Sequence, residues 1–269
     1  MRELYRDLVD KNVITFTTDK NYLPFAKILV NSIKKNSPNL EIVGRFVNCS
    51  DNDLLEFKNI SIISDTKKLS TIRNLKTKEG LYAVDTEDLT LKNKTSVKPL
   101  KLFYSELIAY CSNIKFNTIK NLLKHNIKNV LYLDVDSIVR GRLDTLFEDL
   151  NNHEFCFYKD KPYSEQLDTK RLEDEDFLYH GGLIGVHNNS NTNNIINWAC
   201  DIVEEDIFDW DVDERIITGF LNKSNSIKNI NVKFKDEMLE TNSIIWSGSG
   251  NTKFTQDRYI EESKKYGTL

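Results

Sequence analysis

Two aspartates, Asp134 and Asp136, follow a short apolar run at residues 129–133 and have the type and spacing to do chemistry together. The run, NVLYL, is typical of a buried strand, and side chains two positions apart on a strand can point to the same side. Two ionised carboxylates that lie close together repel each other unless a cation lies between them. Carboxylate oxygens suit Mg²⁺ or Mn²⁺, so the pair predicts a metal site that could hold a diphosphate.

Aspartate is also favoured in turns after strands, which leaves an ordinary surface turn as the alternative. The longer context favours the metal site, because the stretch NVLYLDVDSIVRGRLDTLFEDL at residues 129–150 resembles the metal-binding segment of glycosyltransferase family 8, the family of glycogenin and of bacterial lipooligosaccharide galactosyltransferases. The resemblance implies a GT-A fold, Mn²⁺ or Mg²⁺ as cofactor, and a UDP-sugar donor whose hexose is moved to a glycan or protein acceptor. It implies contacts with the donor at Asp134, Val135 and Asp136.

The amino end of the chain carries a second match. Residues 13–36, VITFTTDKNYLPFAKILVNSIKKN, resemble the opening strand and helix of the family, including the residues that hold uracil and ribose. Tyr22 could stack on a base, while polar groups in the loop at the strand's carboxyl end could bond base or ribose. The alternative is a core tyrosine beside a turn. The nucleotide contacts that the resemblance implies are Phe16, Thr18, Asp19 and Tyr22.

Two more segments resemble family segments that approach the donor. Lys101, in KPLKL at 98–102, matches a lysine that approaches the donor and would act as a point charge; the alternative is a solvated helix lysine. His180, Gly181 and Gly182 match a segment that flanks the donor sugar, and the two glycines would let the backbone approach the ligand closely. His180 replaces the family's asparagine and could equally be a turn residue.

The acidic residues Asp211, Asp213 and Glu214 are the candidates for catalysis. Asp213 and Glu214 fall where the family has aspartate and glutamine near the reacting sugar. Since the resemblance implies retention of anomeric configuration, the acceptor would attack from the donor side or through a transient adduct on a carboxylate such as Asp213. The alternative is local, because Asp211 three residues before Glu214 is also the acidic analogue of a capping box.

The segment SGSGNTK at 247–253 keeps the spacing of the family's histidine-x-x-glycine-x-x-lysine signature. Gly250 and Lys253 match it, and both could neutralise the departing diphosphate. Ser247 stands where the family has the histidine that is its third metal ligand. A neutral hydroxyl is a poorer ligand than imidazole, so we expect Ser247 to lower the affinity for the metal.

Strand-like and helix-like segments alternate along the chain, which predicts an α/β fold with a mostly parallel central sheet flanked by helices and ligands at the carboxyl ends of the strands. Polar residues 65–97 show no clean period and are expected to form a loop that orders on ligand binding. Strands are expected at 13–17, 41–47, 60–63, 129–133, 154–158, 183–186, 232–234 and 243–246, and helices from Pro24, across 99–123, from a cap at Asp144, and at 194–205 and 213–222.

A chain of 269 residues can bury one sizeable core, so we expect a single domain, and the resemblance implies that it is a Rossmann-like domain of the GT-A type with acceptor-side embellishments. Residues 1–150 would form its nucleotide-sugar half and residues 151–269 its acceptor-side half. The net charge of −4 comes from interspersed acids and bases, which excludes a footprint for nucleic acid. No transmembrane run or secretory signal is evident, and four widely spaced cysteines fit buried thiols, so a cytoplasmic location is expected.

Two other functions remain open. A sugar nucleotidyltransferase also uses an α/β sheet and acidic metal ligands, but it would show a glycine-rich basic loop after the first strand, and TTDKNY contains no glycine. A non-catalytic member of the same fold, which binds a nucleotide or glycan, could have lost turnover together with the histidine at Ser247. P-loop ATPases and serine hydrolases are disfavoured because their glycine motifs do not occur.

Overall fold

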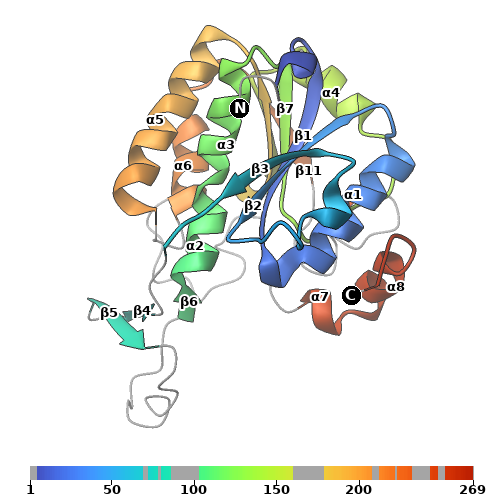
Figure 1. The fold of residues 1–269 in the computed structure, drawn as a ribbon. Coiled ribbons are helices and arrows are strands. Elements are labelled where there is room, and N and C mark those ends of the chain that lie inside the picture. The colour runs from blue at the N-terminus through green and yellow to red at the C-terminus, as the bar shows by residue number, and fades with distance from the viewer. Residues whose placement is uncertain are drawn as a thin grey trace.

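The fold is an α/β fold built on one mixed, mostly parallel sheet, seen in a computed structural model (Figure 1). The strand order is β11-β9-β10-β7-β1-β2-β3, and β10 (Tyr179–His187) runs antiparallel to both of its neighbours. The remaining strands are β1 (Asn12–Asp19), β2 (Glu41–Val47), β3 (Ser61–Asp65), β7 (Asn129–Leu133), β9 (Phe155–Lys159) and β11 (Ile227–Asn231). The structure describes residues 5–68, 72–77, 80–85, 103–159, 179–207, 212–221, 223–231, 243–247 and 252–268.

Helices cover both faces of this sheet, because its central strands are apolar on both sides. In β7, Val130 and Tyr132 belong to one hydrophobic cluster and Leu131 and Leu133 to the other, as the two-residue period of a strand requires. The first cluster includes α3 (Lys115–Lys124), α5 (Ser190–Asp206) and α6 (Val212–Leu221); the second includes α1 (Leu23–Asn36) and α4 (Asp144–Leu150) (Figure 1).

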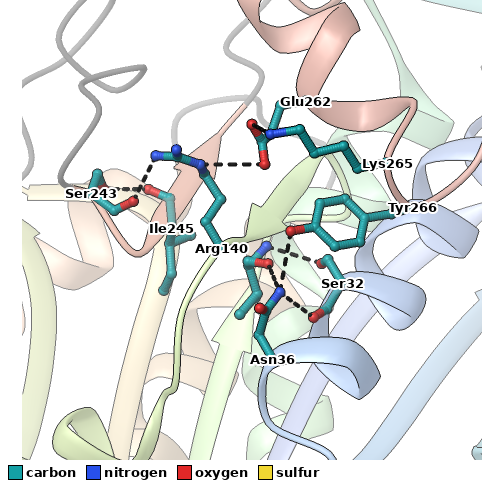
Figure 2. Close-up of polar contacts among 9 residues, drawn as sticks. Ser32, Asn36, Arg140, Ser243, Ile245, Glu262, Lys265 and Tyr266 are labelled. Atoms are coloured by element: carbon teal, nitrogen blue, oxygen red, sulfur yellow. Dashed lines mark hydrogen bonds and ion pairs between the residues drawn. The ribbon is translucent and has the colours of Figure 1, made fainter.

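A C-terminal segment packs against the outer side of α1. Strand β12 (Ile245–Ser247) pairs with β8 (Ser137–Val139), and the short helices α7 (Thr252–Thr255) and α8 (Asp257–Ser263) follow. Trp246 and Tyr259 pack with Phe25 and Ile28 of α1. Figure 2 shows the polar part of this contact, in which Arg140 reaches Glu262 and Ser243 while Asn36 binds Tyr266.

The structure departs from the expected elements in three places. Within residues 65–97, expected to be a loop, β4 (Ile72–Thr77) and β5 (Gly80–Asp85) pair as an antiparallel hairpin. The expected helix across 99–123 contains β6 (Phe103–Ser105), α2 (Glu106–Asn113) and α3, because its apolar spacing runs on through the break at Ile114. Leu143 is the N-cap of α4 and Asp144 lies in its first turn. The expected strand at 232–234 lies outside the described residues.

Among the described residues, no helix has the length and apolar character needed to span a membrane. Strands from before and after residue 150 share the seven-stranded sheet, so the two halves of the chain build one core. The division of these halves into donor and acceptor roles stays a prediction.

Candidate functional site

A cavity of about 120 Å³ lies where the segments after β1 and β7 meet. These strands are adjacent and parallel, with Val13 opposite Val130 and Thr15 opposite Tyr132, so their carboxyl ends share one edge of the sheet. The tertiary structure therefore brings together side chains that are more than a hundred residues apart in sequence. The cavity is lined by Thr17, Thr18, Asp19, Tyr22, Ile108, Cys111, Ser112, Tyr132, Asp134, Val135 and Asp136.

The acidic pair faces this cavity from a tight turn after β7. The backbone N–H of Asp134 donates to the carbonyl of Gly182 at 2.9 Å, and that of Ser137 donates to the carbonyl of Asp134 at 2.9 Å. The Asp134 side chain is 31% exposed and that of Asp136 is 12% exposed. Burial raises the pKa of Asp136 to about 6 although the adjacent Lys253 ammonium acts to lower it. Asp136 is therefore a largely desolvated carboxylate whose charged form is stabilised by the ammonium of Lys253.

Lys253 links the acidic pair to Tyr22 on the other side of the cavity. Its Nζ lies 2.6 Å from Oδ2 of Asp136 and 4.7 Å from the centre of the Tyr22 ring. Burial acts to lower the pKa of Lys253, but the Asp136 carboxylate acts in the other direction, and the pKa is raised above its usual value. The hydroxyl of Tyr259, in the following helix, donates to the backbone carbonyl of Asp136 at 2.7 Å. The C-terminal segment is thus attached directly to the acidic pair.

Lys115, which the sequence analysis did not single out, lies buried behind the acidic pair. Its Nζ donates to Oδ2 of Asp213 at 2.8 Å and to the carbonyl of Gly181 at 2.8 Å, and it lies 3.7 Å from Oδ1 of Asp134. Burial acts to lower the pKa of Lys115, yet the two carboxylates raise it above the usual value. One signal was present in the sequence, since Lys115 shares a helical stripe with the apolar Ile119 and Leu122.

Gly181 fits this arrangement because it has no side chain. A Cβ at this position would collide with Oδ2 of Asp213 and would lie 3.0 Å from Nζ of Lys115. Since β10 is antiparallel to β7, Gly181 and Gly182 lie at the edge of the sheet where Asp134 follows β7. The absence of a side chain at Gly181 therefore lets the Lys115–Asp213 pair approach the β10 backbone.

The structure places the other expected site residues as follows. Phe16 is not brought to the cavity, because its ring is fully buried on the α1 face of the sheet, 5.8 Å from that of Phe46. Ser247 pairs with Ser137 and so lies beside the acidic pair. His180 and Glu214 lie within β10 and α6, but only their backbone is described. Lys101, Asp211 and Gly250 lie outside the described residues.

The donor set of the cavity fits a hard divalent cation. The carboxylates of Asp134 and Asp136 both line the cavity, and the backbone of Ser247 pairs with that of Ser137, the residue after Asp136. Such oxygen donors are of the kind that Mg²⁺ and Mn²⁺ prefer. Among the residues that the structure describes, no group of three histidine, cysteine or acidic side chains could hold a metal. The described residues thus offer a cation the two carboxylates of Asp134 and Asp136, and a cation bound there could take further ligands from a substrate or from water.

Comparison with known proteins identifies the family. The sequence profile described as Glycosyl transferase family 8 matches residues 13–180 of the chain. The chain belongs to glycosyl transferase family 8. The match ends before Asp213, Ser247 and Lys253. In the structure, Asp213 contacts Lys115 and Lys253 contacts Asp136, so both later residues lie against the matched part of the chain. No curated protein sequence matches the chain.

Solved glycosyltransferases share the fold of this family 8 protein. The galactosyltransferase LgtC in complex with donor and acceptor sugar analogs is 15% identical, with a TM-score of 0.55 over 96% of this chain and 97% of that one. An active-site mutant of LgtC is 16% identical, with a TM-score of 0.56 and the same coverage. The bifunctional glycosyltransferase WbbM is 15% identical, with a TM-score of 0.50 over 97% of this chain and 50% of that one. These likenesses confirm the expected GT-A fold.

Proposed function

We propose that this family 8 protein moves a hexose from a UDP-sugar to a glycan or protein acceptor, with retention of anomeric configuration and with Mn²⁺ or Mg²⁺ held by Asp134 and Asp136. One observation carries the proposal: Tyr22 and the acidic pair line the same cavity, and Lys253 bridges them. A nucleotide-sugar is an elongated ligand with an aromatic base at one end and a diphosphate beside the sugar. The cavity offers an aromatic ring and a cluster of charges in the matching order.

The nucleoside would bind on the side of Tyr22. The aromatic ring supplies a stacking surface for the base, and Thr18 and Asp19 stand at the carboxyl end of β1, where ligands of such sheets gather. Oδ1 of Asp19 accepts the backbone N–H of Asn21 at 2.6 Å, which fixes the carboxylate at the start of the next turn. Asp19 can therefore bond a hydroxyl of the ribose without first having to be ordered.

The diphosphate would bind between the acidic pair and Lys253. A divalent cation bound to Asp134 and Asp136 would stabilise the negative charge on the departing nucleoside diphosphate. The lysine is already within reach, because its ammonium contacts Asp136. Ser247 lies next to the pair and would serve at most as a weak additional ligand.

Asp213 would face the reacting sugar, with Lys115 as the residue that positions it. The 2.8 Å contact with Lys115 and the close approach to Gly181 fix the Asp213 carboxylate at the start of α6. A carboxylate held in this way could stabilise positive charge at the anomeric carbon, or attack that carbon as the bond to the diphosphate breaks. Glu214 follows it in the same helix and remains a second candidate for catalysis, as does Asp211.

A thermal-shift panel tests the donor assignment. UDP, GDP and ADP are each added with and without Mn²⁺, and the largest rise in Tm is expected for UDP with Mn²⁺. Asp134→Ala and Asp136→Ala should abolish the gain that depends on the metal. Asp144→Ala, which changes an exposed aspartate paired with Arg142, is the matched control and should respond like the wild type. Equal shifts for all nucleotides, with no effect of metal, would contradict the proposal.

Product analysis then separates the alternative functions. An enzyme should release free UDP from UDP-hexoses in the presence of Mn²⁺, whereas a non-catalytic binder should show the thermal shift without releasing UDP. A sugar nucleotidyltransferase should instead release pyrophosphate from UTP and a sugar 1-phosphate. The absence of glycine from TTDKNY favours the transferase over this last alternative.

A further inference from the structure

Lys253 is bound to Asp136, one of the two carboxylates that a metal ion at this site would also need. Its ammonium contacts Oδ2 of Asp136 at 2.6 Å, and both side chains are nearly buried, with 7% and 12% of their surface exposed. The same ammonium lies over the rings of Tyr22 and Phe25, at 4.7 and 5.5 Å. Lys253 is therefore a desolvated cation bound to one of the two carboxylates assigned to the metal.

A divalent cation and this ammonium would repel each other strongly at Asp136. A Mg²⁺-type ligand oxygen lies about 2 Å from its cation, and the two oxygens of a carboxylate share a single negative charge. Metal on either oxygen would thus lie within a few ångström of the Lys253 ammonium, in a place where burial leaves little solvent to screen the charges. Binding of metal alone should be opposed by the lysine.

A nucleoside diphosphate changes this balance because it brings negative charge to the same place. If the base stacks at Tyr22 and the metal binds the acidic pair, the diphosphate has to pass beside Lys253, which contacts both. We propose that Lys253 is the resident counter-ion of Asp136, that it competes with the divalent cation for this carboxylate, and that it moves to the diphosphate when the nucleotide binds. The inference rests on the proposed donor site and adds that metal and nucleotide bind cooperatively.

Described contacts hold the helix that follows Lys253 and the strand β12 against the turn that carries the acidic pair and the strand β8 after it. Tyr259 donates to the carbonyl of Asp136, and the Arg140 guanidinium lies 3.8 Å from the centre of the Trp246 ring. Arg140 also lies 3.5 Å from Oε1 of Glu262 (Figure 2). The exchange therefore belongs to the Lys253 side chain, whose four-carbon stem can turn its ammonium from a carboxylate to a phosphate.

Electron paramagnetic resonance of Mn²⁺ tests the competition without any turnover. The metal-free protein is titrated with Mn²⁺, first alone and then with saturating UDP. Lys253→Met should tighten the binding of Mn²⁺ alone by roughly tenfold or more, and UDP should tighten it further much less than in the wild type. Lys253→Arg keeps the charge and should behave like the wild type. Lys265→Met is the matched control, since Lys265 lies in the same C-terminal segment but pairs with Glu262 rather than with Asp136, and 56% of its side-chain surface is exposed.

The outcomes separate this inference from the proposed function. If Lys253→Met binds Mn²⁺ alone no better than the wild type, while UDP still strengthens the binding, the competition is overturned and the donor site stands. If no variant binds Mn²⁺ with or without UDP, both proposals fail. Because Lys253→Met could fold poorly, Lys253→Gln, which can still donate to Asp136, is measured as well and should also bind Mn²⁺ more tightly. Equal Mn²⁺ affinity of the wild type with and without UDP would overturn the inference without any variant.

Discussion

The ammonium of Lys115 lies 2.8 Å from Oδ2 of Asp213, and it joins parts of the chain that are far apart in sequence. It also binds the carbonyl of Gly181 at 2.8 Å and lies 3.7 Å from Oδ1 of Asp134. One buried cation in α3 thereby connects the start of α6, strand β10 and the turn that carries the acidic pair. Because two carboxylates depend on it, Lys115 should matter for both stability and function.

Removing the Lys115 ammonium should destabilise the fold and reduce activity. Lys115→Met leaves the nearly buried Asp213 carboxylate without its cation, and breaking a buried pair in this way costs about 3–5 kcal/mol. Urea unfolding measures the loss. Lys124→Met, at an exposed position of the same helix, should change stability by less than about 0.5 kcal/mol. The double variant Lys115→Met/Asp213→Asn removes both charges of the pair, so it should recover part of the stability but should not release UDP. If Lys115→Met alone is as stable as the wild type, the buried ion pair does not stabilise the fold.

A side chain at Gly181 should disturb the same pair from the side of the sheet. In Gly181→Ala the new methyl group would overlap Oδ2 of Asp213, so either the β10 backbone or the carboxylate has to move. Overpacking of this kind costs about 1–3 kcal/mol and should lower kcat by displacing Asp213. The control is Gly267→Ala, where the added Cβ would lie at an ordinary 3.4 Å from Ile28. Equal Tm and kcat for both alanine variants would contradict the expected contact.

The Tyr259 hydroxyl should support binding of metal and nucleotide. Tyr259→Phe removes the 2.7 Å hydrogen bond to the Asp136 carbonyl, which should cost about 1 kcal/mol of stability and weaken binding of UDP with Mn²⁺. Tyr266→Phe is the matched control, because the Asn36 amide that donates to Tyr266 also donates to the carbonyls of Ser32 and Val139. Calorimetric titration with UDP and Mn²⁺ measures the affinity of each variant. A wild-type affinity in Tyr259→Phe would show that the turn carrying Asp136 keeps its structure without this hydrogen bond.

The Glu154 carboxylate should make stability depend on pH. Burial acts to raise its pKa, but hydrogen bonds from Asn225, Asn191 and Ser224 lower it below the usual 4.5. A lowered pKa means that this stabilisation is complete above pH 4.5 and is lost as the pH falls through the value of the folded state. Glu154→Gln, which turns an amide toward these donors, should cost about 1–3 kcal/mol at pH 7.

The difference between Glu154→Gln and the wild type should shrink as the pH falls below 4.5, which urea midpoints at pH 7, 5 and 4 would show. Glu148→Gln, at an exposed position of α4, is the control and should unfold like the wild type at each pH. A constant difference at all three values would mean that the Glu154 carboxylate does not titrate as its hydrogen bonds require.

The sequence by itself determined the family, the α/β class and the position of the acidic pair. These features are local: an apolar strand followed by Asp134 and Asp136, or a strand and helix opened by TTDKNY, can be read from neighbouring residues. The same local pattern predicted β1, β2 and β7 close to their observed bounds. It did not reveal the β4–β5 hairpin, because the apolar residues of these strands do not alternate with polar ones at the two-residue period of a half-buried strand.

Only the tertiary structure decided which side chains meet. Lys115 was missed because its partners Gly181 and Asp213 lie 66 and 98 positions away, and no local pattern reports such a distance. Phe16 was expected at the nucleotide, but the alternation of β1 turns it into the core, and sequence does not say which face of a strand receives which helix. Charges and rings act over a few ångström in space, so their pairing follows from the packing of the sheet rather than from the order of residues.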